Sequence, residues 1–134
     1  MRSIAREVVF KYTISKLFNP TDEELFSVLK KDASLNADDS AFADKLLKYS
    51  VAGTEKYSAV IEESSKQFKL NRIFPADKCI LIMGMAEMDN FPETPTIVII
   101  DEATKLAAKF STERSPDFVN GIIAEYAKNT DRKF

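Results

Sequence analysis

The run "TIVIIDEATKLAAKF" at residues 96–110 constrains the fold of this chain more than any other segment, because its first part is compatible with two kinds of secondary structure. The β-branched residues at 96–100 are typical of a buried strand. They lead without a break into a strongly helical sequence, and no second strand is available to pair with them. We therefore expect a helix here. The residues that keep one face of this helix are Ile97, Ile100, Thr104, Ala107 and Ala108.

The rest of the chain also repeats apolar residues at helical spacing. We expect further helices at about 3–18, 21–31, 42–52, 57–68, 75–88 and 116–128, with loops at 32–40 and 90–95. Ser3 is the expected N-cap of the first helix, and Thr21 opens a capping box for the second. The predicted fold is a compact all-α bundle of about seven helices. It forms one domain over 1–134, with two packed helical subdomains at about 1–72 and 73–134 and a seam near 71–75.

The stretch "SPDFVNGIIAEY" at 115–126 contains a conflict. Asn120-Gly121 between apolar residues is a strong hairpin signal. Ser115, however, is a good N-cap, and a proline follows it at the first helical position. We expect a helix, in which Gly121 costs ~1 kcal/mol relative to alanine and marks close approach of another helix. Asn120 is then expected to satisfy a buried polar group or to cap a neighbouring helix end.

The composition argues against catalysis. The chain has no histidine, which excludes Ser-His-Asp and Cys-His arrangements and any histidine-containing zinc site. Its three glycines are isolated, so they form no phosphate-binding loop. The single cysteine, Cys79, lies in the most apolar helix and is expected to be buried and structural. We therefore expect no enzyme activity, no cofactor and no metal site.

The charge distribution is more informative than the net charge of −2. Residues 1–20 carry Arg2, Arg6, Lys11 and Lys16 against the single acid Glu7, whereas residues 21–44 are rich in acids. Such a contrast can steer a polyanion towards one face, but on charge alone a solvated helix face followed by an acidic loop is the preferred explanation. The N-terminal residues do not read as a signal peptide, and no run reaches the ~18 apolar residues of a membrane span. By elimination we expect a cytoplasmic protein without membrane contact.

Four segments together carry a family pattern. Residues 95–110 match the pattern of a family helix that begins P-x-x-V-x-I-x-E-A. Residues 118–121 read F-V-N-G. "LNRI" (70–73) with "ILIMGMAEM" (80–88), and "AREVVFKY" (5–12), are similar to an L-D-R-I…I-L-R-L-A-x-Y-E segment and an A-R-E opening. In these segments the chain resembles the NusB family of bacterial transcription antitermination factors along almost its whole length.

The resemblance implies an all-helical protein without enzymatic activity. NusB-like proteins pair with NusE, a small-subunit ribosomal protein, and bind the boxA element of nascent RNA, notably in ribosomal RNA transcripts. RNA polymerase in the transcription elongation complex then resists termination. A homodimer is a further possibility, because some relatives self-associate.

Family positions for RNA contact correspond here to Arg2, Arg6 and Phe118. Arg2 and Arg6 lie four residues apart and share a helix face, and guanidinium groups bind phosphates and stack on bases. An exposed Phe118 ring in the first helical turn would stack on an unpaired base for ~1–3 kcal/mol, whereas a core position is the alternative. Glu87 matches a family glutamate that faces NusE.

This sequence departs from the family at several places. The family's basic opening holds several consecutive arginines or lysines, and this chain has only Arg2 and Arg6 there. Ile82 and Ala86 replace a family arginine and tyrosine. Arg114 replaces a common acid and adds positive charge beside Phe118, so we count it among the expected RNA-binding residues. Two alternatives remain: a divergent protein-interaction module without RNA binding, and a fragment of a ribosomal RNA methyltransferase with a NusB-like domain.

Overall fold

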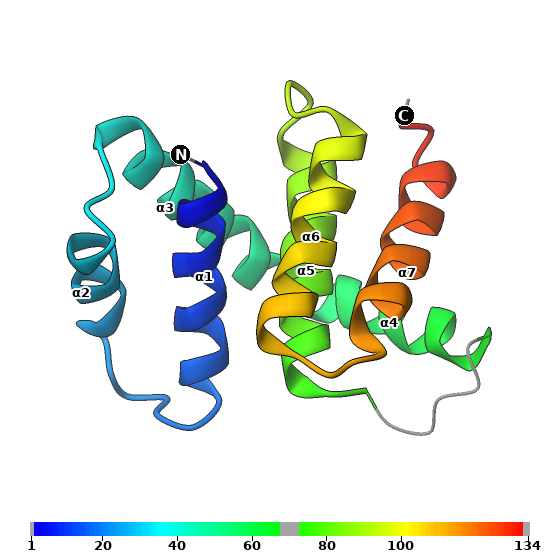
Figure 1. The fold of residues 1–134 in the computed structure, drawn as a ribbon, viewed down its shortest axis with the longest axis horizontal. Helices are drawn as coiled ribbons and strands as arrows, with labels where there is room; N and C mark the ends of the chain where they lie inside the picture. Colours follow the sequence, from blue (N-terminus) through cyan, green and yellow to red (C-terminus); the bar gives the residue numbers. More distant parts are fainter. Residues whose placement is uncertain (1, 68–72, 133–134) are drawn as a thin grey trace. The chain divides into compact units, whose positions relative to one another are not determined.

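The computed structural model describes residues 2–67 and 73–132, and within them every regular element is an α-helix (Figure 1). The prediction of an all-α fold with about seven helices is therefore confirmed. The helices are α1 (Arg2–Lys16), α2 (Leu25–Asp32), α3 (Ala37–Ala52), α4 (Thr54–Gln67), α5 (Pro75–Asn90), α6 (Thr96–Phe110) and α7 (Ser115–Asn129).

The chain divides into two compact units, which we call the N-terminal unit (residues 1–48) and the C-terminal unit (residues 49–134). The boundary lies inside α3 and not near 71–75, where the sequence had suggested a seam. Helix α4 packs against α5 and α7, which explains why it belongs to the C-terminal unit. Part of the expected seam, including Asn71 and Arg72, lies outside the described residues.

The N-terminal unit contains α1 packed against α2, followed by most of α3. Tyr12 of α1 meets Phe26 of α2 with ring centroids 5.1 Å apart. Lys30 of α2 donates to the Asp44 carboxylate of α3 at 2.7 Å. One aromatic contact and one ion pair thus tie α2 to its two neighbours.

Helix starts in this unit differ from the sequence expectation. Helix α1 begins at Arg2, so Ser3 lies inside the helix and is not its N-cap. Helix α2 begins only at Leu25, whose N–H donates to the Asp22 carboxylate at 3.1 Å. Helix α3 begins at residue 37, inside the expected 32–40 loop, because the Asn36 side chain accepts the Asp39 N–H at 2.8 Å. Short polar side chains thus accept backbone N–H groups at the starts of α2 and α3, but the sequence analysis did not identify Asp22 or Asn36 as these residues.

In the C-terminal unit, α5, α6 and α7 pack on one another, and α5 is buried along most of its length (Figure 1). A close approach occurs at Gly84 of α5. A Cβ added at this position would lie 2.8 Å from Cδ1 of Ile123 on α7. Gly84 therefore lets α7 approach α5, a role that the sequence analysis had assigned only to Gly121.

The buried face of α6 is rotated by one residue from the expected one. Ile97 is 60% exposed, whereas Ile99 is 1% exposed. The buried residues of this helix are Thr96, Ile99, Ile100, Ala103, Leu106 and Ala107. Apolar residues occupy both faces of the "TIVII" segment, so the pattern alone did not distinguish them.

Asn120 and Gly121 lie inside α7, so the helix reading is confirmed over the hairpin. Asn120 is exposed and its Nδ2 donates to the Thr104 hydroxyl of α6 at 3.3 Å. It therefore neither satisfies a buried group nor caps a helix end. It joins α6 to α7 at their surface.

Asp89 of α5 joins three helices of the C-terminal unit. Its Oδ2 accepts the hydroxyls of Tyr57 from α4, at 2.7 Å, and Tyr126 from α7, at 2.8 Å. The two rings meet edge to face, with centroids 6.2 Å apart. Burial, followed by the hydrogen bond to Asp89, raises the pKa of both tyrosines well above the ordinary value.

The Arg132 side chain donates hydrogen bonds at the C-terminal end of α5. Its guanidinium donates to the carbonyls of Met88, Thr94 and Phe91 at 2.9, 2.7 and 2.7 Å, and to the Thr96 hydroxyl at 3.0 Å. Carbonyls at a helix C-terminus lack intrahelical partners. One side chain thus satisfies the end of α5 and the loop that leads to α6.

Candidate nucleic-acid interface

Arg2 and Arg6 share one face of α1 and cover the same aromatic ring. The guanidinium carbon of Arg2 lies 4.4 Å from the Phe42 ring centroid, and that of Arg6 lies 5.2 Å from it. Phe42 comes from α3 and is 4% exposed. A ring under a guanidinium attracts it and holds its plane in place. The sequence had marked Phe42 only as an apolar helix residue.

The two arginines differ in exposure. Arg6 is 4% exposed, whereas Arg2 is an exposed residue at the start of α1. A guanidinium that is covered on most of its surface has little room for a phosphate. Of the two, Arg2 is therefore the side chain that meets solvent, whereas Arg6 is buried.

Arg114 and Phe118 lie one helical turn apart in the C-terminal unit. Arg114 occupies the N-cap position of α7 and is exposed, and its carbonyl accepts the Phe118 N–H at 3.3 Å. Phe118 is only 7% exposed. The ring is thus buried from the first turn of α7, which favours the core position given above as the alternative to an exposed ring that stacks on a base.

Ser115 does not act as the N-cap that the sequence suggested. It is the first residue of α7, and its hydroxyl donates to Asp77 Oδ2 at 3.0 Å. The Ser111 hydroxyl donates to Asp77 Oδ1 at 2.6 Å. The turn that carries Arg114 is therefore bound to a carboxylate of α5, which the sequence analysis had not singled out.

Glu87 is buried rather than presented to a partner. Its side chain lies among the largest fully buried ones, with 2% of the residue exposed. It sits in α5, where every residue from Ile80 to Met88 is buried. The burial differs from the surface position that we expected, and contact of Glu87 with a partner protein stays a prediction.

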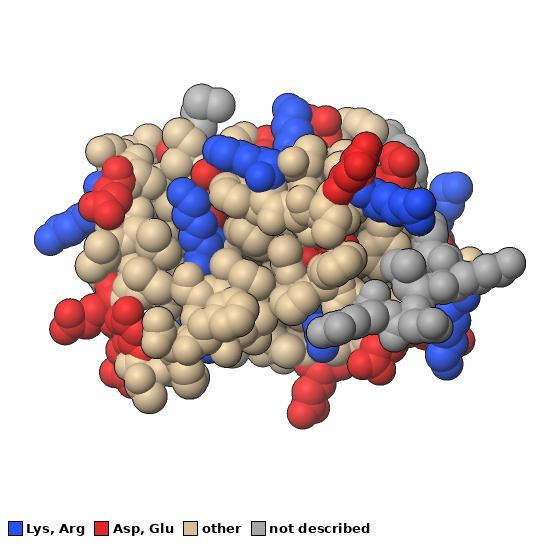
Figure 2. All heavy atoms as spheres, turned by 60° about the horizontal axis from the view of Figure 1, so that its bottom comes forward, with Lys and Arg blue, Asp and Glu red and all other residues tan. Residues whose placement is uncertain are grey.

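Other charges of both signs are interspersed with uncharged surface on the face shown in Figure 2. Several of the lysines are paired. Lys11 lies 3.4 Å from the Glu7 carboxylate, and Lys105 lies 2.9 Å from that of Asp101. The hydrogen bond to Asp101 raises the pKa of Lys105. Such pairing reduces the number of cations that present unbalanced charge to a polyanion.

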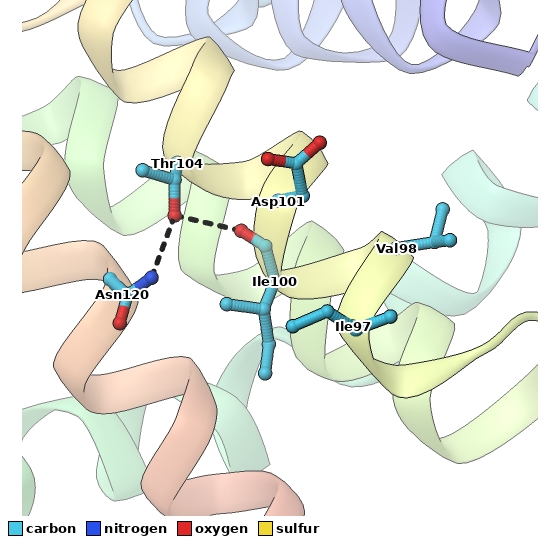
Figure 3. Close-up of a pocket in the computed structure, with 6 residues that line it drawn as sticks. All are labelled: Ile97, Val98, Ile100, Asp101, Thr104 and Asn120. Atoms are coloured by element: carbon cyan, nitrogen blue, oxygen red, sulfur yellow. Dashed lines mark hydrogen bonds between the residues drawn. The ribbon is translucent and has the colours of Figure 1, made fainter. Parts of the chain in front are cut away.

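A mainly apolar hollow of about 280 Å³ is formed by side chains of α6 and one side chain of α7 (Figure 3). It is lined by Ile97, Val98, Ile100, Asp101, Thr104 and Asn120. Ile97 is 60% and Val98 37% exposed, although both are large and apolar. The Thr104 hydroxyl bridges the two helices, since it donates to the Ile100 carbonyl and accepts from Asn120. The hollow was not predicted, because the sequence analysis placed Ile97 on the same helix face as the buried Ile100 and Ala107.

Among the described residues, no acidic or cysteine side chains gather in a group of three or more that would hold a metal ion. The helices described are too short or too polar to cross a membrane. Cys79 is partly exposed and not fully buried as expected. Leu70, Asn71 and Arg72, which carry part of the family resemblance, lie outside the described residues.

Comparison with known proteins agrees with the resemblance noted in the sequence. The chain is 30% identical to the transcription antitermination protein NusB of Alkaliphilus oremlandii, covering 95% of this chain and 90% of that protein. Its fold matches NusB of T. maritima with a TM-score of 0.82 at 28% identity, covering 96% of this chain and 91% of the other.

A solved complex of the antitermination factors NusB and NusE with double-stranded RNA matches with a TM-score of 0.79 at 24% identity. The match covers 96% of this chain and 96% of the other, and it bears on the fold alone. The sequence model of the NusB family matches residues 1–128. The chain therefore belongs to the NusB family.

Proposed function

We propose that this chain is a transcription antitermination factor that binds boxA-type RNA together with a NusE-type ribosomal protein. The observation that carries the proposal is the match of the NusB family to residues 1–128, together with relatives that are named as antitermination proteins. In this role the chain acts in the cytoplasm, as part of the transcription elongation complex, and it acts by binding and without catalysis.

Exposed arginines give the proposed RNA contact its chemistry. Arg2 lies on α1 with its guanidinium over the Phe42 ring, and Arg114 stands at the start of α7. Both are exposed, and guanidinium groups bind phosphates with two parallel hydrogen bonds. Arg6 supports the same ring from a buried position, and Phe118 supports the start of α7 from the interior.

A second candidate function is protein interaction without RNA binding. The observation that favours it is the small number of exposed arginines among the described residues, since Arg6 and Arg132 are both used within the fold. Fewer phosphate contacts mean lower affinity and a weaker dependence on salt.

A titration of fluorescein-labelled boxA RNA separates the two candidates. The protein is added with and without the cognate NusE, at two salt concentrations. Antitermination predicts RNA binding that NusE tightens and that salt weakens. Binding to NusE without RNA affinity, in either arrangement, would support the interaction module instead.

A further inference from the structure

Asp77 is a buried acid in the first turn of α5. Its carboxylate accepts hydrogen bonds from the turn between α6 and α7. The residue is 3% exposed. Its Oδ1 accepts the Ser111 hydroxyl at 2.6 Å, and its Oδ2 accepts the Ser115 hydroxyl at 3.0 Å. Both distances lie within the general range of hydrogen bonds donated by hydroxyl groups to oxygen. A negative group also suits the first turn of a helix.

Ser115 extends this contact into the turn itself. Its Oγ accepts the Thr112 N–H at 3.1 Å, and its own N–H donates to the Thr112 carbonyl at 3.1 Å. The Thr112 hydroxyl lies 2.7 Å from the same Oγ. Ser115 is 1% exposed, so these bonds form away from solvent. The turn is thus fixed on both sides of residues 113 and 114.

Between these fixed points the chain presents Glu113 and Arg114 to solvent. The Arg114 backbone is held further, because its carbonyl begins the hydrogen-bond ladder of α7. A side chain on a fixed backbone loses less conformational freedom when it binds a ligand. The hydrogen bonds to Asp77 therefore fix the backbone from which the Arg114 side chain extends.

We propose that Asp77 is a positioning residue for RNA binding, which acts by fixing the 111–115 turn so that Arg114 meets an RNA phosphate. This inference rests on the proposed function. Asp77 itself does not touch the RNA, since it is buried beneath the turn.

The test is a double-mutant cycle on the full chain, with fluorescein-labelled single-stranded boxA RNA as the probe and NusE present. The variants are Asp77→Asn, Arg114→Ala and the two combined. One phosphate contact on a single strand contributes ~0.7 to the salt slope, which corresponds to about fivefold in affinity at ~0.1 M salt. We expect that loss for Arg114→Ala, a loss of similar size for Asp77→Asn, and no additional loss for the combination.

Asp89→Asn is the matched control, because Asp89 is also an acid of α5 that accepts two hydroxyl groups from other helices. It is expected to lower the melting temperature and to leave RNA affinity unchanged. Should Asp77→Asn fail to fold, Ser111→Ala replaces it. That variant removes the 2.6 Å bond to Asp77 Oδ1 and the 2.9 Å contact between the Ser111 and Ser115 hydroxyls, and it leaves the Ser115 bond to Asp77 Oδ2 in place.

Two results would overturn the inference while leaving the proposed function intact. One is RNA affinity in Asp77→Asn equal to that of the unmodified protein. The other is a combined loss equal to the product of the single losses, which would mean that Asp77 acts independently of Arg114. If the unmodified chain does not bind the RNA at all, the proposed function fails first and the positioning role fails with it.

Discussion

The start of α1 and the 111–115 turn both present an arginine, but they hold it by different means. At α1, Arg2 and Arg6 lie over one aromatic ring, at 4.4 and 5.2 Å from its centroid. At the turn, hydroxyl groups bound to Asp77 fix the backbone that carries Arg114. The first arrangement holds the guanidinium itself, whereas the second holds only the main chain beneath it.

This difference shows that matching a family position does not by itself place a residue at a surface. The resemblance led us to expect RNA contact at Arg6 and Phe118, yet they are 4% and 7% exposed. Arg2 and Arg114 are exposed. Each region thus pairs one exposed cation with one buried residue that supports it, and variants at the four positions test this division.

The largest effect is expected for Phe118→Ala. Because the ring is buried, its removal should cost ~3–5 kcal/mol of unfolding free energy, measured by urea denaturation. Phe18→Ala is the control, since Phe18 is 76% exposed and should lose little. Unchanged stability combined with weakened RNA binding would contradict the buried assignment and return Phe118 to the interface.

Arg6→Ala is expected to come next. A guanidinium that is desolvated against a ring contributes ~2 kcal/mol, so the unfolding free energy should fall by about that amount. Arg6→Lys serves as the control, because it keeps the charge and loses the planar stacking. If Arg6→Ala leaves stability intact but lowers the salt slope of RNA binding, then Arg6 is a phosphate contact like Arg2.

Alkaline pH should act on the C-terminal unit, where Tyr57 and Tyr126 bond to Asp89. Their pKa values are raised in the folded state, so the folded protein keeps protons that the unfolded chain releases above pH ~10. Stability is therefore fully present below that pH and falls as pH rises through it, by ~1.4 kcal/mol per unit and per tyrosine. Urea denaturation at successive pH values should show a shallower fall in Tyr126→Phe. An equal fall in the variant would refute this account.

The smallest effect on stability is expected for Arg2→Ala. An exposed cation over a ring contributes only ~0.5–1 kcal/mol. The salt slope of RNA binding should nevertheless decrease by ~0.7, because one phosphate contact to a single strand is lost. Lys66→Ala removes another exposed cation as a control. Identical slopes in Arg2→Ala and the unmodified protein would remove Arg2 from the interface.

The fold was largely predictable because helices are encoded locally. The 96–110 segment and the helix through Asn120-Gly121 were assigned correctly despite their strand and hairpin signals. It was harder to predict which face of each helix is buried and which residues contact one another. The buried side of α6 was wrong by one residue, since apolar residues occupy both sides of "TIVII".

The support of the 111–115 turn could not be predicted from the sequence. The partners of Asp77 lie 34 and 38 residues further along the chain, and no local pattern links an acid to serines at that distance. The burial of Glu87 was likewise hidden, because a glutamate within an apolar helix usually marks the solvent side. The only signal in the sequence was that apolar residues occupy all sides of the helix around Glu87, all of which are buried in the structure.

The position of Arg132 has a consequence for the order in which this protein is completed during synthesis. Its guanidinium reaches the Met88 carbonyl, 44 residues earlier in the chain. On the ribosome, α5 and the loop after it emerge well before this arginine does, and their carbonyls must first bond to water. The C-terminal unit therefore reaches its final form only after residue 132 has been released, and a nascent chain that stalls earlier carries an α5 whose end is still open.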